Sequence, residues 1–317
     1  MNTREVYEVF CSQNTEMPVF LKPWWLDAVY GNAWTVILYK EGDRVLAAMP
    51  YCECKKYGFK TILPPQLTPI TGFWIAYPEN MTRQNRYSLE IKAMEYFAKR
   101  LNEIKPAYFV SKIHHSYSSW LGFLWNNYSQ TTRYTYRFTK LNDLDYLFSQ
   151  LDKSVRKRIR QLEKEEFVIR TDLSSKEFYN VNGMTYKRQG LKCPFSYEQF
   201  ERIDAEACKR NMSGKFAICD KEGNVHSVAY VIFDDEVCQG IFSGSDSKYR
   251  SSNAASLLLW HILKVCSEKG IKEYDFNGSS MKSIETFIRH FGAEQTPYMV
   301  IEKKNSMLYS LLKKLKR

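Results

Sequence analysis

The sequence lacks the features of a membrane-spanning or secreted protein. No apolar run approaches the roughly 18 residues that a membrane-spanning helix needs. Acidic residues interrupt the N-terminal stretch MNTREVYEVF, so it does not have the pattern of a secretory signal peptide. Cys52 and Cys54 are two residues apart, but no second cysteine pair or nearby histidine completes a zinc site. We therefore expect a cytoplasmic protein with reduced thiols and no metal site.

The composition is that of a globular chain with a basic surface. Hydrophobic residues make up 44% of the 317 residues and aromatic residues 15%, which is enough apolar material for packed cores. This length exceeds one ordinary core, so we expect two domains, residues 1–150 and 151–317. The net charge of +11 and the pI near 9.1 indicate a polyanionic partner, which is RNA, a phosphorylated precursor, a nucleotide or an anionic membrane.

The two halves of the chain repeat one order of elements. Each has a hairpin, with the turns Lys40-Glu41-Gly42-Asp43 and Lys221-Glu222-Gly223-Asn224. Each continues into a long amphipathic helix, expected over Arg83 to Asn102 and Asn253 to Lys269, and then into a short buried strand. Two copies of one α/β unit explain this order most simply.

The stretch from Ile241 to Ala293 predicts an anion site. It reads as a strand, a loop rich in serine, glycine and asparagine, and the start of a long helix. Unpaired backbone N–H groups point out of the first turn of such a helix, and an anion can bind there. The predicted donor-binding residues are Ser245, Arg250, Ser251, Ser252, Asn253 and Ala254.

Several segments resemble the FemAB-like branch of the GNAT acyltransferase superfamily. They are KPWWLDAVYG, PPQLTP, SVRKRIRQLEKEEFVI, GSDSKYRSSNAASLLLWHIL, and YDFNGS followed by FIRHFGA. The resemblance implies an α/β (α+β) fold of two tandem GNAT-like domains, with mixed sheets flanked by helices. It also implies transfer of an acyl or aminoacyl group to an amine of a cell-envelope or polysaccharide precursor.

The chain departs from the family pattern at two places. The peptidoglycan aminoacyltransferases of this branch usually have a Phe-Lys pair where this chain has Phe287-Ile288, with a basic residue only at Arg289. The phosphate loop of simple acetyltransferases has a glycine where this chain has Asn253. Asparagine tolerates a left-handed backbone better than most residues, so we expect the loop to keep its shape. The first departure weakens the case for an aminoacyl-tRNA donor, and the second leaves coenzyme A binding open. An acyl-CoA such as acetyl-CoA is expected to act as a donor substrate and not as a tightly bound cofactor.

The strand ending at Phe276 supplies the candidate catalytic residues. Asp275 alternates with Phe276, so if Phe276 faces the core, Asp275 faces the other side. We predict Asp275 as the base or substrate-orienting group, with Asn277 and Ser279 beside it. An alternative of equal weight is that Asp275 or Asn277 caps the next helix or stabilises the Asn277-Gly278 turn, and Ser279 is also a plausible cap.

A basic helix expected over Asp152 to Glu166 is the candidate substrate surface. Its basic residues recur at three and four and share one side, where they could hold a pyrophosphate-linked precursor or an RNA backbone. The alternative is a solvated face paired with Glu163, Glu165 and Glu166. The predicted substrate-binding residues are Lys153, Arg156, Lys157, Arg160, Tyr186, Phe287 and Arg289.

The expected partners are a phosphorylated or nucleotide-linked precursor, tRNA, or a membrane surface. The last is suggested by the C-terminal helix, which places Met307, Leu308, Leu311, Leu312 and Leu315 on one face beside several lysines. The alternative is that this helix docks on the body with a solvated basic edge. Two functions compete with acyl-CoA-dependent transfer: an aminoacyl-tRNA-dependent peptidoglycan-precursor ligase, and a catalytically silent binding protein for RNA or anionic lipid.

Overall fold

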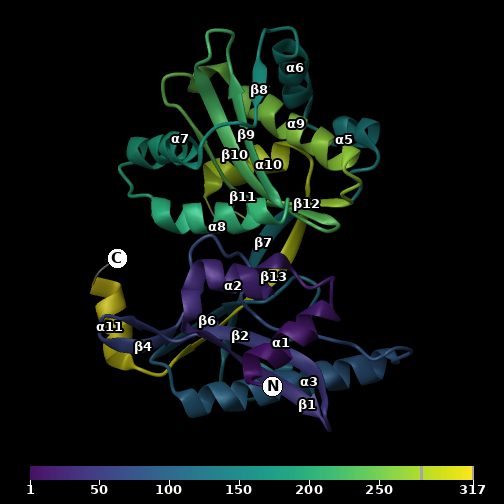
Figure 1. The fold of residues 1–317 in the computed structure, drawn as a ribbon, viewed down its shortest axis with the longest axis vertical. Coiled ribbons are helices and arrows are strands. Elements are labelled where there is room, and N and C mark those ends of the chain that lie inside the picture. The colour runs from purple at the N-terminus through teal and green to yellow at the C-terminus, as the bar shows by residue number, and fades with distance from the viewer. Residues whose placement is uncertain (279–280, 316–317) are drawn as a thin grey trace. The chain divides into compact units, whose positions relative to one another are not determined.

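A computed structural model of the protein describes residues 1–278 and 281–315. The chain forms two compact units (Figure 1). The first unit comprises Met1–Arg133 and Pro297–Arg317, and the second comprises Tyr134–Thr296. We predicted a boundary after residue 150 from the sequence, and that division into domains stays a prediction.

The first unit combines two groups of strands with a long helix. Its strands are hydrogen-bonded in the orders β1-β2-β5 and β3-β4-β6-β13. The helix α3 buries apolar residues at three- and four-residue spacing against these strands, and it ends where Lys105 takes a left-handed backbone. The elements of this unit are α1 (Thr3–Ser12), η1 (Val19–Leu21), α2 (Pro23–Tyr30), η2 (Gly31–Ala33), β1 (Trp34–Glu41), β2 (Arg44–Cys52), β3 (Cys54–Lys56), β4 (Phe59–Ile62), β5 (Trp74–Ile75), α3 (Arg83–Ile104), β6 (Tyr108–Lys112), α4 (Leu121–Leu124), β13 (Glu294–Lys304) and α11 (Met307–Leu315).

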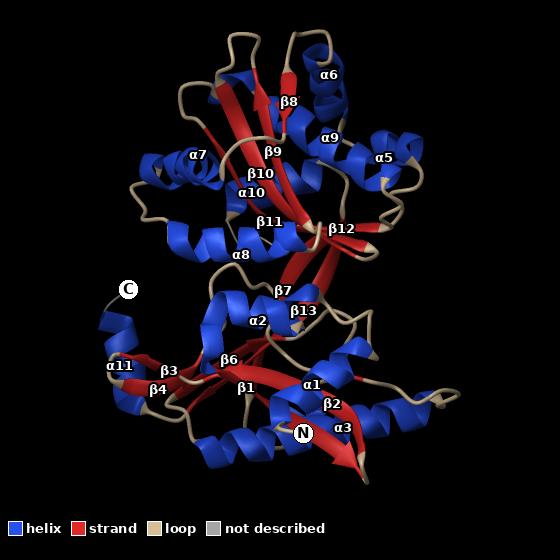
Figure 2. Ribbon diagram, in the orientation of Figure 1, coloured by secondary structure: helices blue, strands red, loops and turns tan. Residues whose placement is uncertain are grey.

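The second unit is a mixed sheet with helices on both faces. Its strands follow the order β7-β12-β11-β10-β9-β8, and β11 and β12 are parallel. Figure 2 shows α7 and α8 on one side of the sheet and α9 on the other. The elements are β7 (Ser129–Phe138), α5 (Leu144–Gln150), α6 (Lys153–Leu162), β8 (Val168–Arg170), α7 (Ser175–Arg188), α8 (Tyr197–Lys209), β9 (Ser213–Cys219), β10 (Val225–Asp234), β11 (Val237–Ser245), η3 (Arg250–Ser252), α9 (Ala254–Glu268), β12 (Glu273–Asp275) and α10 (Lys282–His290).

Each face of this second sheet has its own core. On one face, α9 buries nine residues, because its apolar positions cover almost the whole circumference of the helix, and α6 packs against it through Val155, Ile159 and Leu162. On the other face, Phe178 and Phe200 pack edge-on against Tyr230. The predicted α/β class, with mixed sheets flanked by helices, is confirmed.

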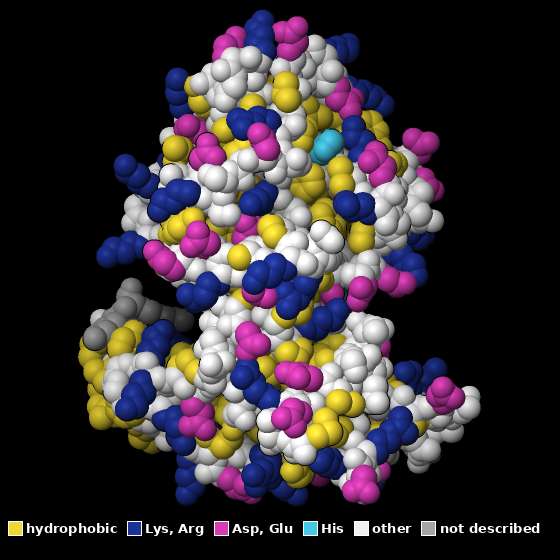
Figure 3. Space-filling model, viewed as in Figure 1, with side chains coloured by type: hydrophobic (Ala, Val, Ile, Leu, Met, Phe, Trp, Pro, Cys, Tyr) yellow, Lys and Arg dark blue, Asp and Glu magenta, His cyan; other side chains and the backbone are white. Residues whose placement is uncertain are grey.

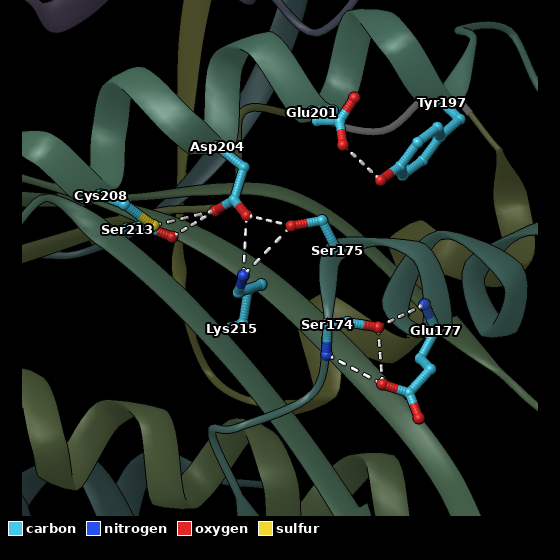
Figure 4. A network of polar contacts seen from close by, with 9 residues as sticks. All are labelled: Ser174, Ser175, Glu177, Tyr197, Glu201, Asp204, Cys208, Ser213 and Lys215. Carbon is cyan, nitrogen blue, oxygen red and sulfur yellow. Dashed lines mark hydrogen bonds and ion pairs between the residues drawn. The ribbon is translucent and has the colours of Figure 1, made fainter.

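A buried polar network ties α7 and α8 to β9 (Figure 4). The carboxylate of Asp204 accepts hydrogen bonds from Lys215 Nζ at 2.7 Å, Ser175 Oγ at 2.6 Å and Ser213 Oγ at 2.7 Å. Burial by itself would raise the pKa of Asp204, but these hydrogen bonds outweigh it and lower the pKa. The network therefore holds a charged carboxylate in a place where an unpaired one would be costly.

In the part of the chain that the structure describes, no helix is both long enough and apolar enough to cross a membrane.

Candidate functional site

The strands β11 and β12 separate from each other halfway along β11. They pair from Val237 with Glu273 to Gln239 with Asp275, where β12 ends while β11 continues to Ser245. Asn277 then takes a left-handed backbone with φ of 56°, and its side-chain amide donates to the carbonyl of Gly240 at 3.0 Å. Beyond Gly240, β11 therefore has no strand paired on its β12 side in the described part of the chain.

A β-bulge lies on β11 where the two strands separate. Tyr230 of β10 pairs with Phe242 and Val231 pairs with Gly240, so Ile241 has no counterpart on β10. A bulge of this kind turns a backbone group out of the ladder, and bulges are over-represented next to active sites. The neighbouring position is tightly packed, because a Cβ on Gly240 would lie 2.6 Å from the hydroxyl of Tyr274 and would displace that side chain.

A cavity of about 310 Å³ occupies the gap between the diverging strands. Its walls come from β10, β11, α9, α10 and the residues around β12, with Tyr186 contributed by α7. Most of the wall is apolar, and the wall residues that carry a hydroxyl group are Tyr186, Ser227, Tyr230, Ser243 and Tyr274. A concave, mainly apolar cavity with a few polar groups is typical of a small-molecule site. All of these residues belong to the second unit.

The predicted anion loop leads directly into a wall of this cavity. Residues Arg250 to Ser252 form a 3-10 turn, and Asn253 has φ of 57°, the left-handed backbone that asparagine tolerates. Ser252 Oγ accepts from the N–H of Ala254 at 3.3 Å, at the start of α9. The next residue, Ala255, lines the cavity. The predicted loop thus adjoins the cavity.

A histidine from β10 braces the loop. His226 Nδ1 lies 2.9 Å from Ser252 Oγ, and its Nε2 lies 3.2 Å from Asp220 Oδ2. The imidazole also stacks on Tyr249 with ring centroids 4.4 Å apart. Ser245, at the other end of the loop, is held by its backbone N–H, which donates to Thr185 Oγ1 at 2.9 Å. The loop is therefore fixed at both ends, while Arg250 itself is exposed.

Asp275 has the contacts of a residue that stabilises a turn. Its side chain is buried, and Oδ1 accepts from Thr135 Oγ1 at 2.5 Å and from the N–H of Asn277 at 2.7 Å. Burial raises the pKa of Asp275, although the hydrogen bonds from Thr135 and Asn277 partly offset this effect. Tyr274 and Phe276 line the cavity, but Asp275 and Asn277 do not. The third predicted catalytic residue, Ser279, lies outside the described residues.

The predicted substrate-binding residues do not all come together. Tyr186 and Phe287 line the cavity. Arg289 pairs with Glu285 at 2.9 Å on the exposed side of α10. The basic residues of α6, which are Lys153, Arg156, Lys157 and Arg160, lie elsewhere in the second unit and contribute nothing to the cavity wall. Two of these four side chains contact α5, because Arg156 Nη1 donates to the carbonyl of Ser149 at 2.8 Å and Arg160 lies over the ring of Phe148.

Ile288 was noted in the sequence only as the residue that replaces the family's lysine. It is 4% exposed and lines the cavity together with Ile284 and Phe287 of the same helix. The departure from the family pattern at this position therefore places an apolar side chain in the wall of the site.

Residues 149–286 match the family described as an acetyltransferase (GNAT) domain. Most of the second unit therefore matches a GNAT domain. The divergent strands, the bulge, the loop and the start of α9 all lie within the matched residues of this domain. No curated protein sequence matches the chain.

Solved structures with the same fold include tandem GNAT proteins. The crystal structure of FemX has a TM-score of 0.67 and 12% sequence identity, and the alignment covers 100% of this chain and 99% of FemX. L-PGS from Bacillus licheniformis has a TM-score of 0.55 and 12% identity over 90% of each chain. A tandem GNAT protein from the clavulanic acid biosynthesis pathway has a TM-score of 0.53 and 9% identity, over 87% of this chain and 84% of its own. The predicted resemblance to FemAB-like tandem GNAT proteins is confirmed at the level of the fold.

Proposed function

We propose that the protein is an N-acyltransferase that binds an acyl-CoA, with acetyl-CoA as the simplest donor, in the cavity of its GNAT domain. The observation that carries this proposal is the open side of β11 next to an apolar cavity and an anion loop. An acyl-CoA has a matching series of groups, which are a small acyl group, an arm with amide groups and a pyrophosphate. Amide groups can hydrogen-bond to an unpaired strand edge, as a further strand would.

Two groups at the site suit the chemistry of transfer. The acceptor amine attacks the thioester carbonyl carbon, a C–N bond forms, the C–S bond breaks, and the amine loses a proton to solvent. Negative charge develops on the carbonyl oxygen, and the backbone N–H of the bulged residue Ile241 is our candidate to stabilise it. The leaving thiolate needs a proton, and Tyr186 in the cavity wall is our candidate donor. Burial raises the pKa of Tyr186, so its hydroxyl keeps its proton at neutral pH.

The wall formed by α10 favours acyl-CoA over aminoacyl-tRNA as the donor. The peptidoglycan aminoacyltransferases that this chain resembles have a lysine where Ile288 lies, and Ile288 is buried in the cavity wall. Ile284 and Phe287 extend this apolar surface. Such a wall suits a small uncharged acyl group better than a donor whose handling uses a cation.

The acceptor is proposed from the resemblance and from charge. We propose an amine on a phosphorylated or nucleotide-linked precursor of the cell envelope or of a polysaccharide. The net charge of +11 supports an anionic acceptor, since a basic protein attracts anionic ligands at long range.

Filling the cavity tests the proposed donor. Ala255 is a half-buried cavity residue in the first turn of α9, and Ala255→Trp places a large ring there. Glu268→Trp puts the same side chain at the exposed end of the same helix and serves as the matched control. By calorimetry, we expect acetyl-CoA to bind the wild type and the control alike. Binding to Ala255→Trp should weaken by about tenfold or more, which is about 1.4 kcal/mol, because the indole ring occupies space that the ligand needs.

Two results would contradict the proposal. One is equal affinity of Ala255→Trp and Glu268→Trp for acetyl-CoA. The other is a rise in melting temperature with bulk tRNA and none with acetyl-CoA, because a ligand that binds the folded state raises that temperature. The second result would favour the aminoacyl-tRNA-dependent ligase. Release of free CoA thiol in the presence of amine acceptors then separates an enzyme from a silent binding protein.

A further inference from the structure

The C-terminal helix α11 exposes most of its apolar residues. Met307 is 93% exposed, Leu308 58%, Leu311 55% and Leu315 74%. Successive positions are one, three and four residues apart, which places all four within about 100° of the helix circumference and so in one stripe along the helix. The sequence allowed a helix docked on the body, and the structure shows that this stripe is not the docking face.

The opposite side of α11 fixes the helix to the first unit. Tyr309 is 1% exposed, and its ring centroid lies 6.0 Å from that of Tyr57, 5.9 Å from that of Phe59 and 5.6 Å from that of Tyr108. The ammonium of Lys313 lies 3.9 Å from the ring centroid of Tyr108. These contacts set the rotation of α11 about its axis, so the apolar stripe points away from the body.

The helix that carries the stripe is basic. The nine residues of α11 include no aspartate or glutamate, and Lys314 is an exposed cation one residue before Leu315. Lys56 lies beside Tyr57, one of the rings that hold the helix. Figure 3 shows hydrophobic side chains gathered at the position of α11. Apolar residues next to lysines, with no acidic residue on the helix, match the chemistry of an anionic bilayer surface.

We propose that α11 binds the surface of an anionic phospholipid bilayer. Met307, Leu308, Leu311 and Leu315 enter the boundary between headgroups and acyl chains, and Lys314 contacts the headgroup phosphates. A helix of nine residues buries little apolar area, so it needs the lysines as a second signal and gives weak, reversible binding. The proposal is independent of acyl transfer, because α11 belongs to the first unit and contributes nothing to the cavity wall.

Vesicle co-sedimentation with the full-length protein tests this proposal. Vesicles of phosphatidylcholine alone are compared with vesicles that also contain phosphatidylglycerol, at low and at high salt. We expect binding to the anionic vesicles at low salt only, because at 0.1 M ionic strength salt already screens interactions between exposed charges more than about 10 Å apart, and higher salt shortens this distance. The variant Leu308→Ser/Leu311→Ser should reduce the bound fraction about tenfold or more, since two leucines no longer enter the bilayer.

A matched control separates this stripe from exposed apolar residues in general. Val9 and Leu124 are 44% and 42% exposed on other helices of the first unit, and Val9→Ser/Leu124→Ser should bind vesicles like the wild type. All four positions are exposed, so the melting temperatures should stay the same and should verify folding. Three results overturn the proposal: equal binding to neutral and anionic vesicles, an equal loss in both double variants, and wild-type dimers that Leu308→Ser/Leu311→Ser dissociates without any vesicle binding.

Discussion

Substitution of Asp275 by asparagine and by leucine decides whether this residue is a general base or a residue that stabilises the turn at Asn277. Asparagine keeps a side-chain oxygen that can accept from Thr135 Oγ1 and from the N–H of Asn277, but leucine keeps none. The structure favours a positioning role, because Asp275 contacts the turn and does not line the cavity. We therefore expect Asp275→Asn to retain acyl transfer and Asp275→Leu to lose stability.

The comparison of the two variants isolates the hydrogen bonds. Both variants lack the charge, so their difference in free energy of unfolding reports the Thr135 hydroxyl and the Asn277 N–H that leucine leaves without an acceptor. Each unsatisfied buried group costs about 1–3 kcal/mol, so Asp275→Leu should be less stable than Asp275→Asn by about 2–6 kcal/mol. Urea unfolding of the two variants, followed by circular dichroism, measures this difference.

The charge of Asp275 has a separate pH signature. Burial raises the pKa of Asp275 above the ordinary value of 3.8, so the folded state binds the proton more tightly than the unfolded state. The wild type should therefore lose stability as the pH rises from the ordinary value through the raised one. Asp275→Asn has no such group, so its stability relative to the wild type should increase over the same range. If the wild type instead becomes more stable relative to Asp275→Asn as the pH rises, this reasoning is refuted.

Activity completes the test of Asp275. A general base contributes at least about 100-fold to the rate, so a catalytic Asp275 requires a loss of that size in Asp275→Asn. We expect a loss below tenfold, with the Kd of acetyl-CoA unchanged. A 100-fold loss at an unchanged melting temperature would show that Asp275 is catalytic after all.

The remaining predictions concern the buried network and the proposed proton donor. Lys215→Met leaves the buried carboxylate of Asp204 without its cation and should cost about 3–5 kcal/mol at neutral pH in urea unfolding, whereas Asp204→Asn/Lys215→Met should cost less. The hydrogen bonds lower the pKa of Asp204, so the stability that the charged carboxylate supplies is present above pH 3.8 and is lost as the pH falls through the lowered pKa. The loss of stability caused by Lys215→Met should therefore shrink at acid pH. A loss that does not change with pH would contradict this account. Tyr186→Phe should lower kcat about 100-fold with an unchanged Kd for acetyl-CoA. Because burial raises the pKa of Tyr186, the wild-type rate should not fall through loss of this proton until the pH exceeds the ordinary pKa of 10. An unchanged kcat in Tyr186→Phe would remove it as the donor.

The sequence predicted the individual elements well because their signals are local. The predicted helix Asn253 to Lys269 is found at Ala254–Glu268, since its apolar spacing and the glycine that follows it define both ends. The association of the chain ends was not predictable in this way. Residues Pro297 to Arg317 belong to the first unit because β13 pairs with β6, from Val300 opposite Lys112 to Lys304 opposite Tyr108. No periodicity within either segment encodes that pairing.

The difference between local signals and long-range pairing also explains which parts of the candidate site the sequence revealed. The loop at Arg250 to Ala254 was found because a strand, a loop of small polar residues and a helix start follow one another locally in the sequence, and Asn253 tolerates the left-handed backbone that it takes there. The cavity was missed because it depends on where β12 stops pairing and on the bulge at Ile241, and both follow from the register between strands distant in sequence.

The C-terminal helix shows the same limit in its simplest form. Its apolar pattern predicted one hydrophobic stripe, and a stripe can face the core or face away from it with equal local propensity. A single residue outside the stripe decides between these orientations, because Tyr309 finds three aromatic partners on β3–β4 and β6 that no helical pattern could identify. Burial of Tyr309 thus leaves four apolar side chains exposed. A contiguous exposed apolar stripe usually marks a surface that binds something. Because this stripe lies beside lysines and no acidic residue on the same helix, we assign it to an anionic bilayer.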